Sequence, residues 1–141
     1  MEIVRCYEGD YEMLAGIWER SVMATHNFLN EEDFNEIKAA LIPDYFPNVE
    51  LYAATADGIP VGFIGLSPHT IEMLFIDNGR RSQGYGSALI EFAKQRGATK
   101  VDVNEQNPFA LRFYKSKGFH VVGRDETDDA GHPYPILHLS L

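Results

Sequence analysis

The chain has 141 residues, 45% of them hydrophobic and 23% charged, a composition typical of one globular domain spanning residues 1–141. The formal net charge of −9 disfavours binding to nucleic-acid phosphates, and no apolar run approaches the roughly 20 residues of a membrane span. With no signal-peptide pattern and Cys6 as the single cysteine, we expect a cytoplasmic protein without a disulfide, and without nucleic-acid or membrane partners.

The chain begins with a short strand and two helices. Residues 2–6 are predicted to form the strand, which should bury an inert Cys6. Asp10 is predicted to cap a helix that ends near Val22, because apolar residues recur there at helical spacing. A second helix is expected over 31–41, ending before the proline two residues later.

Three strands are predicted next, over 51–55, 61–66 and 70–76. Asp57-Gly58 lies between the first two and is a strong signal for a β-hairpin. The third strand leads into a glycine-containing loop, 78–86, that should open a helix.

The second half alternates strands with helices. The helix after the loop should end near Arg96, and a strand is expected over 100–103. Asn107 followed by a proline is typical of a helix start, and Gly118 should end that helix. The last strands are predicted over 119–124 and 136–141. This order favours an α/β (mixed α+β) fold, a mixed sheet with helices on both faces.

The loop before the third helix is a candidate phosphate site. The first turn of a helix carries unpaired N–H groups and partial positive charge, and Gly84 and Gly86 would let a ligand approach the main chain. The alternative is that these glycines only permit a tight turn. The nucleotide-triphosphatase loop is absent, and Leu89 stands where a dinucleotide-binding motif needs a third small residue.

Two segments resemble the GNAT superfamily of N-acetyltransferases. Residues 81–86, Arg-Ser-Gln-Gly-Tyr-Gly, are similar to its CoA-binding signature, and residues 107–119 are similar to its Asn-x-x-Ala-x-x-Phe-Tyr-x-x-x-Gly-Phe motif. Residues 18–29, 103–107 and 133–135 resemble the small bacterial acetyltransferases of the YjaB type. The resemblance implies the GNAT fold, a mostly antiparallel sheet of about six to seven strands, and transfer of an acetyl group from acetyl-CoA to a primary amine.

The resemblance also implies how CoA would bind. Its pyrophosphate should lie on the main-chain N–H groups of residues 82–87, and its pantetheine arm should pair with Leu74 and Ile76. Asn107 should reach this arm, serve as the helix N-cap, or do both. The expected cofactor-binding residues are Leu74, Phe75, Ile76, Arg81, Ser82, Gln83, Gly84, Tyr85, Gly86, Ser87, Asn107, Phe113 and Tyr114.

Tyr114 occupies the family's general-acid position, where a phenol can donate a proton to the departing sulfur. The alternative is a core tyrosine bonded to the main chain. The general base is less well defined, because Thr70 stands where many relatives carry glutamate. His69 and Glu72 are the first candidates and His26 is the third. A main-chain N–H near Met73 or Leu74 should stabilise the oxyanion.

Several alternatives stay open in the sequence. The acceptor is either a small-molecule amine or a protein amine, and the chain is either a monomer or a homodimer. A noncatalytic regulator that binds acetyl-CoA is the alternative function. No metal site is expected, because His120, His132 and His138 show no ligand spacing with cysteine or carboxylates and are interpreted as structural.

Overall fold

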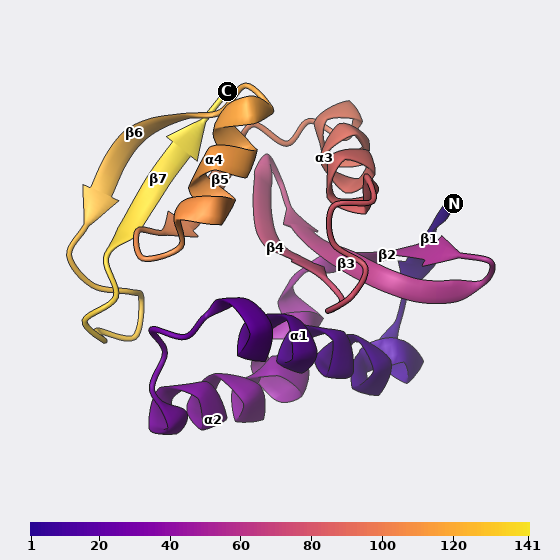
Figure 1. Cartoon of the computed structure of the whole chain (residues 1–141), viewed down its shortest axis with the longest axis horizontal. Coiled ribbons are helices and arrows are strands. Elements are labelled where there is room, and N and C mark those ends of the chain that lie inside the picture. The colour runs from indigo at the N-terminus through magenta and orange to yellow at the C-terminus, as the bar shows by residue number, and fades with distance from the viewer.

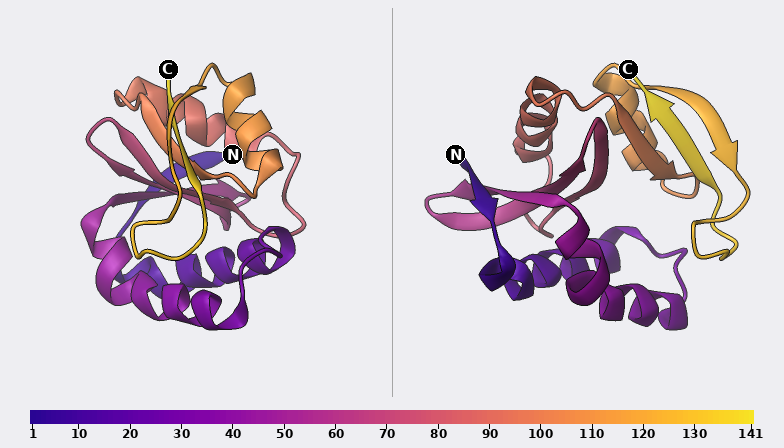
Figure 2. Two further views of the ribbon diagram at one scale, coloured as in Figure 1. Left: turned by 90° about the vertical axis from the view of Figure 1, so that its left-hand side faces the viewer. Right: turned by 180° about the vertical axis from the view of Figure 1, so that it is seen from behind.

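The computed structural model, which describes residues 1–141, contains one seven-stranded sheet in the order β1-β2-β3-β4-β5-β7-β6 (Figure 1). Only β4 and β5 pair in parallel, so the expected mixed and mostly antiparallel sheet is confirmed. Figures 1 and 2 show that β1–β4 and β5–β7–β6 form two sections that twist away from each other. The strands are β1 (Glu2–Cys6), β2 (Glu50–Ala56), β3 (Ile59–Ser67), β4 (Thr70–Ile76), β5 (Lys100–Asn104), β6 (His120–Asp125) and β7 (Ile136–Ser140).

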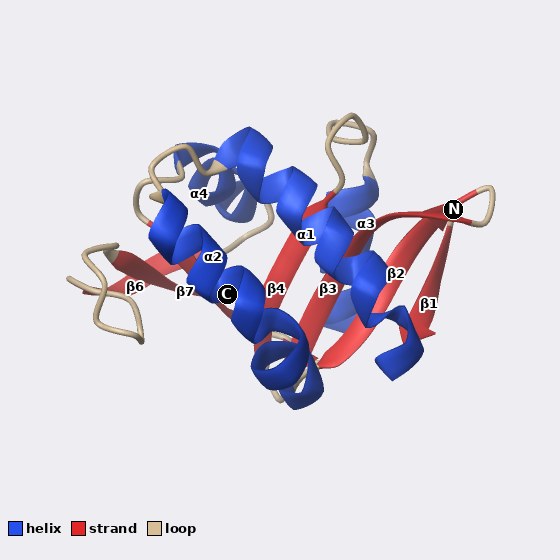
Figure 3. Ribbon diagram, turned by 90° about the horizontal axis from the view of Figure 1, so that it is seen from below, coloured by secondary structure: helices blue, strands red, loops and turns tan.

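Helices cover both faces of the sheet, as expected. In Figure 3, α1 and α2 lie on one face, and α1 contacts β3 and β4. On the other face α3 packs on β3 and β4, while α4 packs on β5. No helix combines the length and the hydropathy that crossing a membrane requires. The helices are α1 (Tyr11–Thr25), α2 (Glu31–Ala40), α3 (Tyr85–Gln95) and α4 (Pro108–Ser116), with short turns η1 (Glu8–Asp10), η2 (Leu41–Tyr45) and η3 (Phe46–Asn48).

The start and end of α1 differ from the prediction. The Asp10 carboxylate accepts a hydrogen bond from the main-chain N–H of Tyr7 at 2.9 Å and makes no side-chain cap on α1. Asp10 therefore closes the η1 turn, and its capping role in α1 was wrongly predicted. The helix also continues past Val22 to Thr25, because nothing at Val22 interrupts its hydrogen bonds.

The β2–β3 connection and the first strand agree with the sequence. Asp57 and Gly58 both have positive φ, 52° and 78°, as the tight hairpin turn requires. Cys6 is 3% exposed, and burial raises the pKa of its thiol to about 11. It is therefore a packed and unreactive residue.

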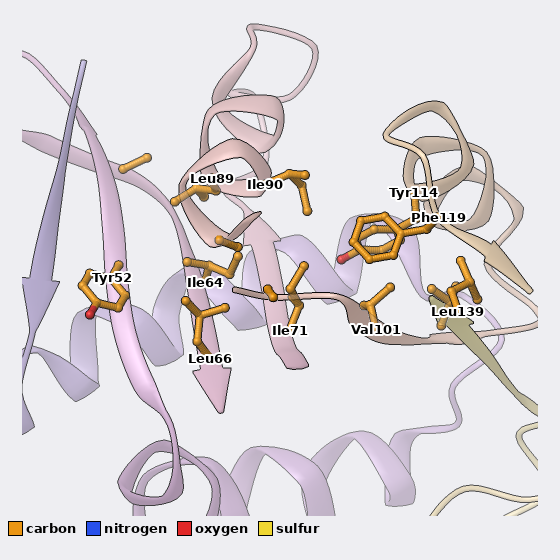
Figure 4. Close-up of a cluster of buried hydrophobic side chains, with 14 of the residues drawn as sticks. Tyr52, Ile64, Leu66, Ile71, Leu89, Ile90, Val101, Tyr114, Phe119 and Leu139 are labelled. Atoms are coloured by element: carbon orange, nitrogen blue, oxygen red, sulfur yellow. The ribbon is translucent and has the colours of Figure 1, made fainter. Parts of the chain in front are cut away.

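Two hydrophobic cores lie on the two faces of the sheet. The core under α1 is formed by α1, η2, η3 and strands β1 to β3, with Leu14, Ile17 and Phe63 fully buried. The core under α3 and α4 runs across both sections of the sheet (Figure 4). It joins Leu89 and Ile90 of α3 to β3 and β4, and residues of α4 to β5 and β7, so it fixes how the two sections meet.

Candidate active site

The central feature is the separation of β4 from β5. The two strands pair only at Thr70–Lys100 and Ile71–Val101. Beyond Ile71, β4 continues to pair with β3 on its other edge, so its main-chain groups facing β5 are left without a strand partner. A cleft of about 820 Å³ lies between the strands and is lined from Ile71 to Ile76 on β4 and from Val101 to Asn104 on β5.

A bulge in β4 accompanies this separation. Gly65 of β3 pairs with Met73 and Leu66 pairs with Ile71, so Glu72 is an extra residue without a partner. The bulge reverses the side-chain alternation, and Met73 and Phe75 consequently pack on the α1 side. Glu72 itself is exposed and lines the cleft.

The cleft brings together the residues that the resemblance assigned to the cofactor, with one exception. Gln83 does not line it, because its side-chain amide turns back and donates to the carbonyl of Gly79 at 3.3 Å. Arg80 also lines the cleft, next to the expected Arg81. Lys115 and Lys117, two basic residues at the end of α4, do not line it. The expected residues that line the cleft are Leu74, Phe75, Ile76, Arg81, Ser82, Gly84, Tyr85, Gly86, Ser87, Asn107, Phe113 and Tyr114.

The start of α3 has the properties of an anion site. Gly84 precedes the helix with φ of 91°, and no side chain caps the first turn. The N–H groups of Tyr85, Gly86 and Ser87 therefore have no intrahelical or capping partner. A Cβ on Gly86 would lie 3.2 Å from the Phe113 ring, so any larger residue would crowd this surface. These features fit a pyrophosphate.

Asn107 shows that the two roles considered for it are compatible. Its Oδ1 accepts a hydrogen bond from the main-chain N–H of Ala110 at 3.2 Å, which caps α4. Its Nδ2 makes no hydrogen bond within the chain, and the residue lines the cleft. The amide group is therefore free to donate to a ligand while the oxygen holds the helix.

Tyr114 of α4 is buried in the core with its hydroxyl directed at the cleft. Its ring packs between Phe113 and Phe119, with centroids 5.4 and 5.8 Å away. Figure 4 shows the hydroxyl pointing toward the side of Ile71. It makes no hydrogen bond within the chain, and burial raises the pKa of the phenol, which stays protonated. Both properties suit a proton donor.

His26, at the end of α1, has the geometry of a base. Its Nδ1 lies 2.8 Å from Oγ1 of Thr25, which donates its own hydrogen to the carbonyl of Ser21 at 2.7 Å. His26 must therefore be the donor in this contact, and Nε2 keeps its lone pair. Burial lowers the pKa of His26, so the ring is neutral at neutral pH. His26 lines the cleft.

The other two candidate bases occupy different positions. Glu72 lines the cleft, and its Oε1 accepts a hydrogen bond from the Ser67 hydroxyl at 2.8 Å. His69 does not line the cleft. It lies in the β3–β4 turn with φ of 68°, and its Nδ1 is 3.2 Å from the carbonyl of Gly97. The structure therefore brings Glu72 and His26 into the cleft with Tyr114, but not His69.

The sequence analysis did not identify Asp102 or the pair Ser21 and Thr25 as site residues. Asp102 lines the cleft and lies 2.7 Å from Nδ1 of His138. Ser21 was visible only as a small polar residue on the apolar face of α1. A polar side chain at such a position is the signal that could have indicated a cavity.

Comparison with known proteins identifies the family. Residues 21–135 match the family model described as an acetyltransferase (GNAT) domain. The chain is 43% identical to the peptidyl-lysine N-acetyltransferase YjaB of Salmonella typhimurium, over 99% of this chain and 97% of that protein, and 42% identical to YjaB of Escherichia coli, over 99% and 96%. The solution structure of apo-form YjaB from Escherichia coli superposes with a TM-score of 0.90 at 41% identity, covering 99% of this chain and 95% of that chain. The chain belongs to the GNAT family of acetyl-CoA-dependent N-acetyltransferases.

Proposed function

We propose that this enzyme acetylates lysine side chains of proteins, using the cleft between β4 and β5 for both substrates. The two curated relatives at 42–43% identity carry the name peptidyl-lysine N-acetyltransferase. Two carboxylates of the cleft, those of Glu72 and Asp102, suit a cationic acceptor. Arg80 and Arg81 also line the cleft, and in this proposal they serve the phosphates of CoA, which leaves the two carboxylates to attract a lysine ammonium.

The donor side of the cleft is formed by β4 and the start of α3. The free N–H groups of Tyr85, Gly86 and Ser87 would hold the pyrophosphate of acetyl-CoA. The unpaired edge of β4 would bind the pantetheine arm as a neighbouring strand binds, and Nδ2 of Asn107 would donate to it. A main-chain N–H of Met73 or Leu74 would donate to the acetyl oxygen as negative charge develops there.

The acceptor side is formed by the end of α1. As the neutral lysine nitrogen bonds to the acetyl carbon, Nε2 of His26 accepts the proton that the nitrogen loses. Glu72 is the second candidate for this role, with its Oε1 already accepting a hydrogen bond from the Ser67 hydroxyl. His69 lies outside the cleft and would need a water chain to take part.

Tyr114 acts on the departing sulfur in this proposal. When the carbon–sulfur bond breaks, the electron pair stays on sulfur, and the phenol hydrogen of Tyr114 transfers to it. The observation that carries the mechanism is the arrangement in one cleft of an unpaired strand edge, an uncapped helix start and an unbonded tyrosine hydroxyl.

The test is acetylation of matched peptides. One peptide has a single lysine and a blocked N-terminus, and the other has a free N-terminus and no lysine. Each peptide is incubated with acetyl-CoA and followed by mass spectrometry and a thiol-release assay. Acetylation and CoA release should occur with the lysine peptide only. Acetylation of the free N-terminus alone would refute the lysine assignment. CoA binding without release for either peptide or any small amine would favour the noncatalytic alternative.

A further inference from the structure

Outside the cleft, a histidine of the β6–β7 connection meets two carboxylates of α2. His132 Nε2 lies 3.4 Å from Oδ1 of Asp33 and 3.3 Å from Oε2 of Glu36. The three atoms all lie within 4.8 Å of one another. None of the three residues lines the cleft. This cluster therefore belongs to no part of the acetyl-transfer machinery described above.

The spacing fits a small divalent ion. Zinc bonds of about 2.0–2.1 Å in a tetrahedral shell place neighbouring ligand atoms about 3.3 Å apart. The two distances from His132 Nε2 agree with this value. Neither meets the alignment of a hydrogen bond, so Oδ1 of Asp33 accepts none although the residue is only 8% exposed. Oδ1 of Asp33 is thus a solvent-accessible carboxylate oxygen that faces the cluster and accepts no hydrogen bond.

Groups behind two of the three residues hold them in place. Oδ2 of Asp128 lies 3.3 Å from Nδ1 of His132, the position in which a carboxylate typically orients a metal-binding imidazole. The hydroxyl of Tyr134 donates to Oδ2 of Asp33, which leaves Oδ1 as the oxygen facing His132. The ligand atoms of Asp33 and His132 therefore point inward without the ion, while the 58% exposed Glu36 side chain completes the cluster from the surface.

Charge also favours a cation here. Asp33, Glu36 and Asp128 surround one imidazole, and no lysine or arginine forms an ion pair with any of the three. Even a protonated His132 would leave the cluster negative. A divalent ion would neutralise two carboxylates that now face each other across His132.

We propose that Asp33, Glu36 and His132 bind one Zn²⁺ ion, with water completing the shell, and that the ion fastens the β6–β7 connection to α2. The one-histidine, two-carboxylate ligand set favours zinc over magnesium or calcium, which select oxygen ligands alone. The site adjoins the acceptor side: the Tyr134 ring is 6.2 Å from Phe28, whose ring is 5.2 Å from that of His26.

The test is titration of the tag-free, metal-stripped chain with Zn²⁺, followed by calorimetry and thermal unfolding. The wild type should bind one equivalent and unfold at higher temperature with zinc. His132→Ala should abolish binding, and Asp128→Asn should weaken it roughly 10- to 100-fold. Co²⁺ in place of Zn²⁺ should give the visible absorption of four-coordinate cobalt. His120→Ala and Glu32→Gln, which alter an exposed histidine and an exposed acid outside the cluster, should bind as the wild type does.

If His132→Ala does not fold, Glu36→Gln decides, because that side chain is 58% exposed and its loss leaves the core intact. A loss of affinity in Glu36→Gln of about tenfold or more supports the site. The proposal is overturned if no stoichiometric binding occurs, or if His132→Ala or Glu36→Gln binds zinc as tightly as the wild type. In those cases His132 serves only as a hydrogen-bonding and ion-pairing link between α2 and the β6–β7 connection.

Discussion

The guanidinium of Arg20 and the carboxylate of Asp77 form two parallel hydrogen bonds, Nε to Oδ1 at 2.8 Å and Nη2 to Oδ2 at 3.0 Å. Arg20 belongs to α1, and Asp77 directly follows β4, where the loop that we propose to bind the pyrophosphate begins. The carbonyl of Asp77 also accepts the N–H of Arg80 at 3.0 Å. This pair therefore fixes the base of the loop against the helix that carries His26.

Arg20→Ala should loosen the loop more than the fold. The Arg20 side chain is 56% exposed, and exposed ion pairs contribute only about 0.2–1 kcal/mol to stability. We expect unfolding to change little, while the Kd for CoA rises by up to about fivefold. Calorimetric titration checks this. Lys38→Ala, which removes the exposed pair with Glu19 at 3.0 Å, is the control and should keep wild-type affinity.

Gly86→Asp should abolish CoA binding. The new Cβ would lie 3.2 Å from the Phe113 ring, and the carboxylate would put negative charge where we propose that the pyrophosphate binds. Lys115→Ala is the matched control, because Lys115 does not line the cleft, and its affinity should change only slightly. Equal losses of affinity in the two variants would show that side-chain charge, not the helix start, dominates CoA binding.

His26→Ala should remove the ascending limb of the pH profile of kcat/KM. Because burial lowers the pKa of His26, that limb should lie below about pH 6.5 in the wild type. The acceptor ammonium should contribute a second limb near its own, much higher pKa, and this limb should persist in the variant. We expect kcat to fall on the order of 10²- to 10⁴-fold. If the variant keeps the lower limb, His26 is not the general base, and Glu72 becomes the candidate.

His138 should make stability depend on pH. Hydrogen bonds to Asp102 at 2.7 Å and Asp125 at 2.6 Å raise the pKa of His138 in the folded state. The resulting stabilisation is fully present below the unfolded pKa of about 6.5 and is lost as pH rises through the folded pKa. His138→Ala should therefore lower the free energy of unfolding more near pH 6 than near pH 9. Urea titrations of the wild type and the variant at the two pH values measure this difference. An equal loss at both pH values would mean that packing, not charge, explains the effect.

Local sequence patterns predicted most of the fold. Asp57-Gly58 specifies its turn because few other residues tolerate positive φ, and Asn107 caps α4 as expected. The strand order could not be predicted, because β7 pairs with both β5 and β6 through contacts between residues distant in the chain. Periodicity reports which face of an element is apolar, and it carries no information on its neighbours.

The site could be predicted only in part for the same reason: local patterns do not report which distant residues meet. The residues expected to bind CoA lie mostly in two continuous motifs, and all of them except Gln83 line one cleft. His69 and Glu72 are close in sequence, yet the β3–β4 turn and the β4 bulge direct them to different places. Asp33 and Tyr134 are separated by 101 positions and form a buried hydrogen bond that no local pattern reveals. The histidine beside them, His132, was accordingly interpreted without its carboxylate partners.

The most direct test of the mechanism is the steady-state kinetics of Tyr114→Phe with acetyl-CoA and a lysine peptide. The substitution keeps the ring and its packing against Phe113 and Phe119, and the lost hydroxyl has no partner within the chain, so stability should hardly change. We predict a fall in kcat on the order of 10²- to 10⁴-fold with nearly unchanged affinity for acetyl-CoA, because the donated proton matters only as sulfur gains charge. Near-wild-type kcat, under conditions where chemistry limits the rate, would contradict the assignment of Tyr114 as the acid.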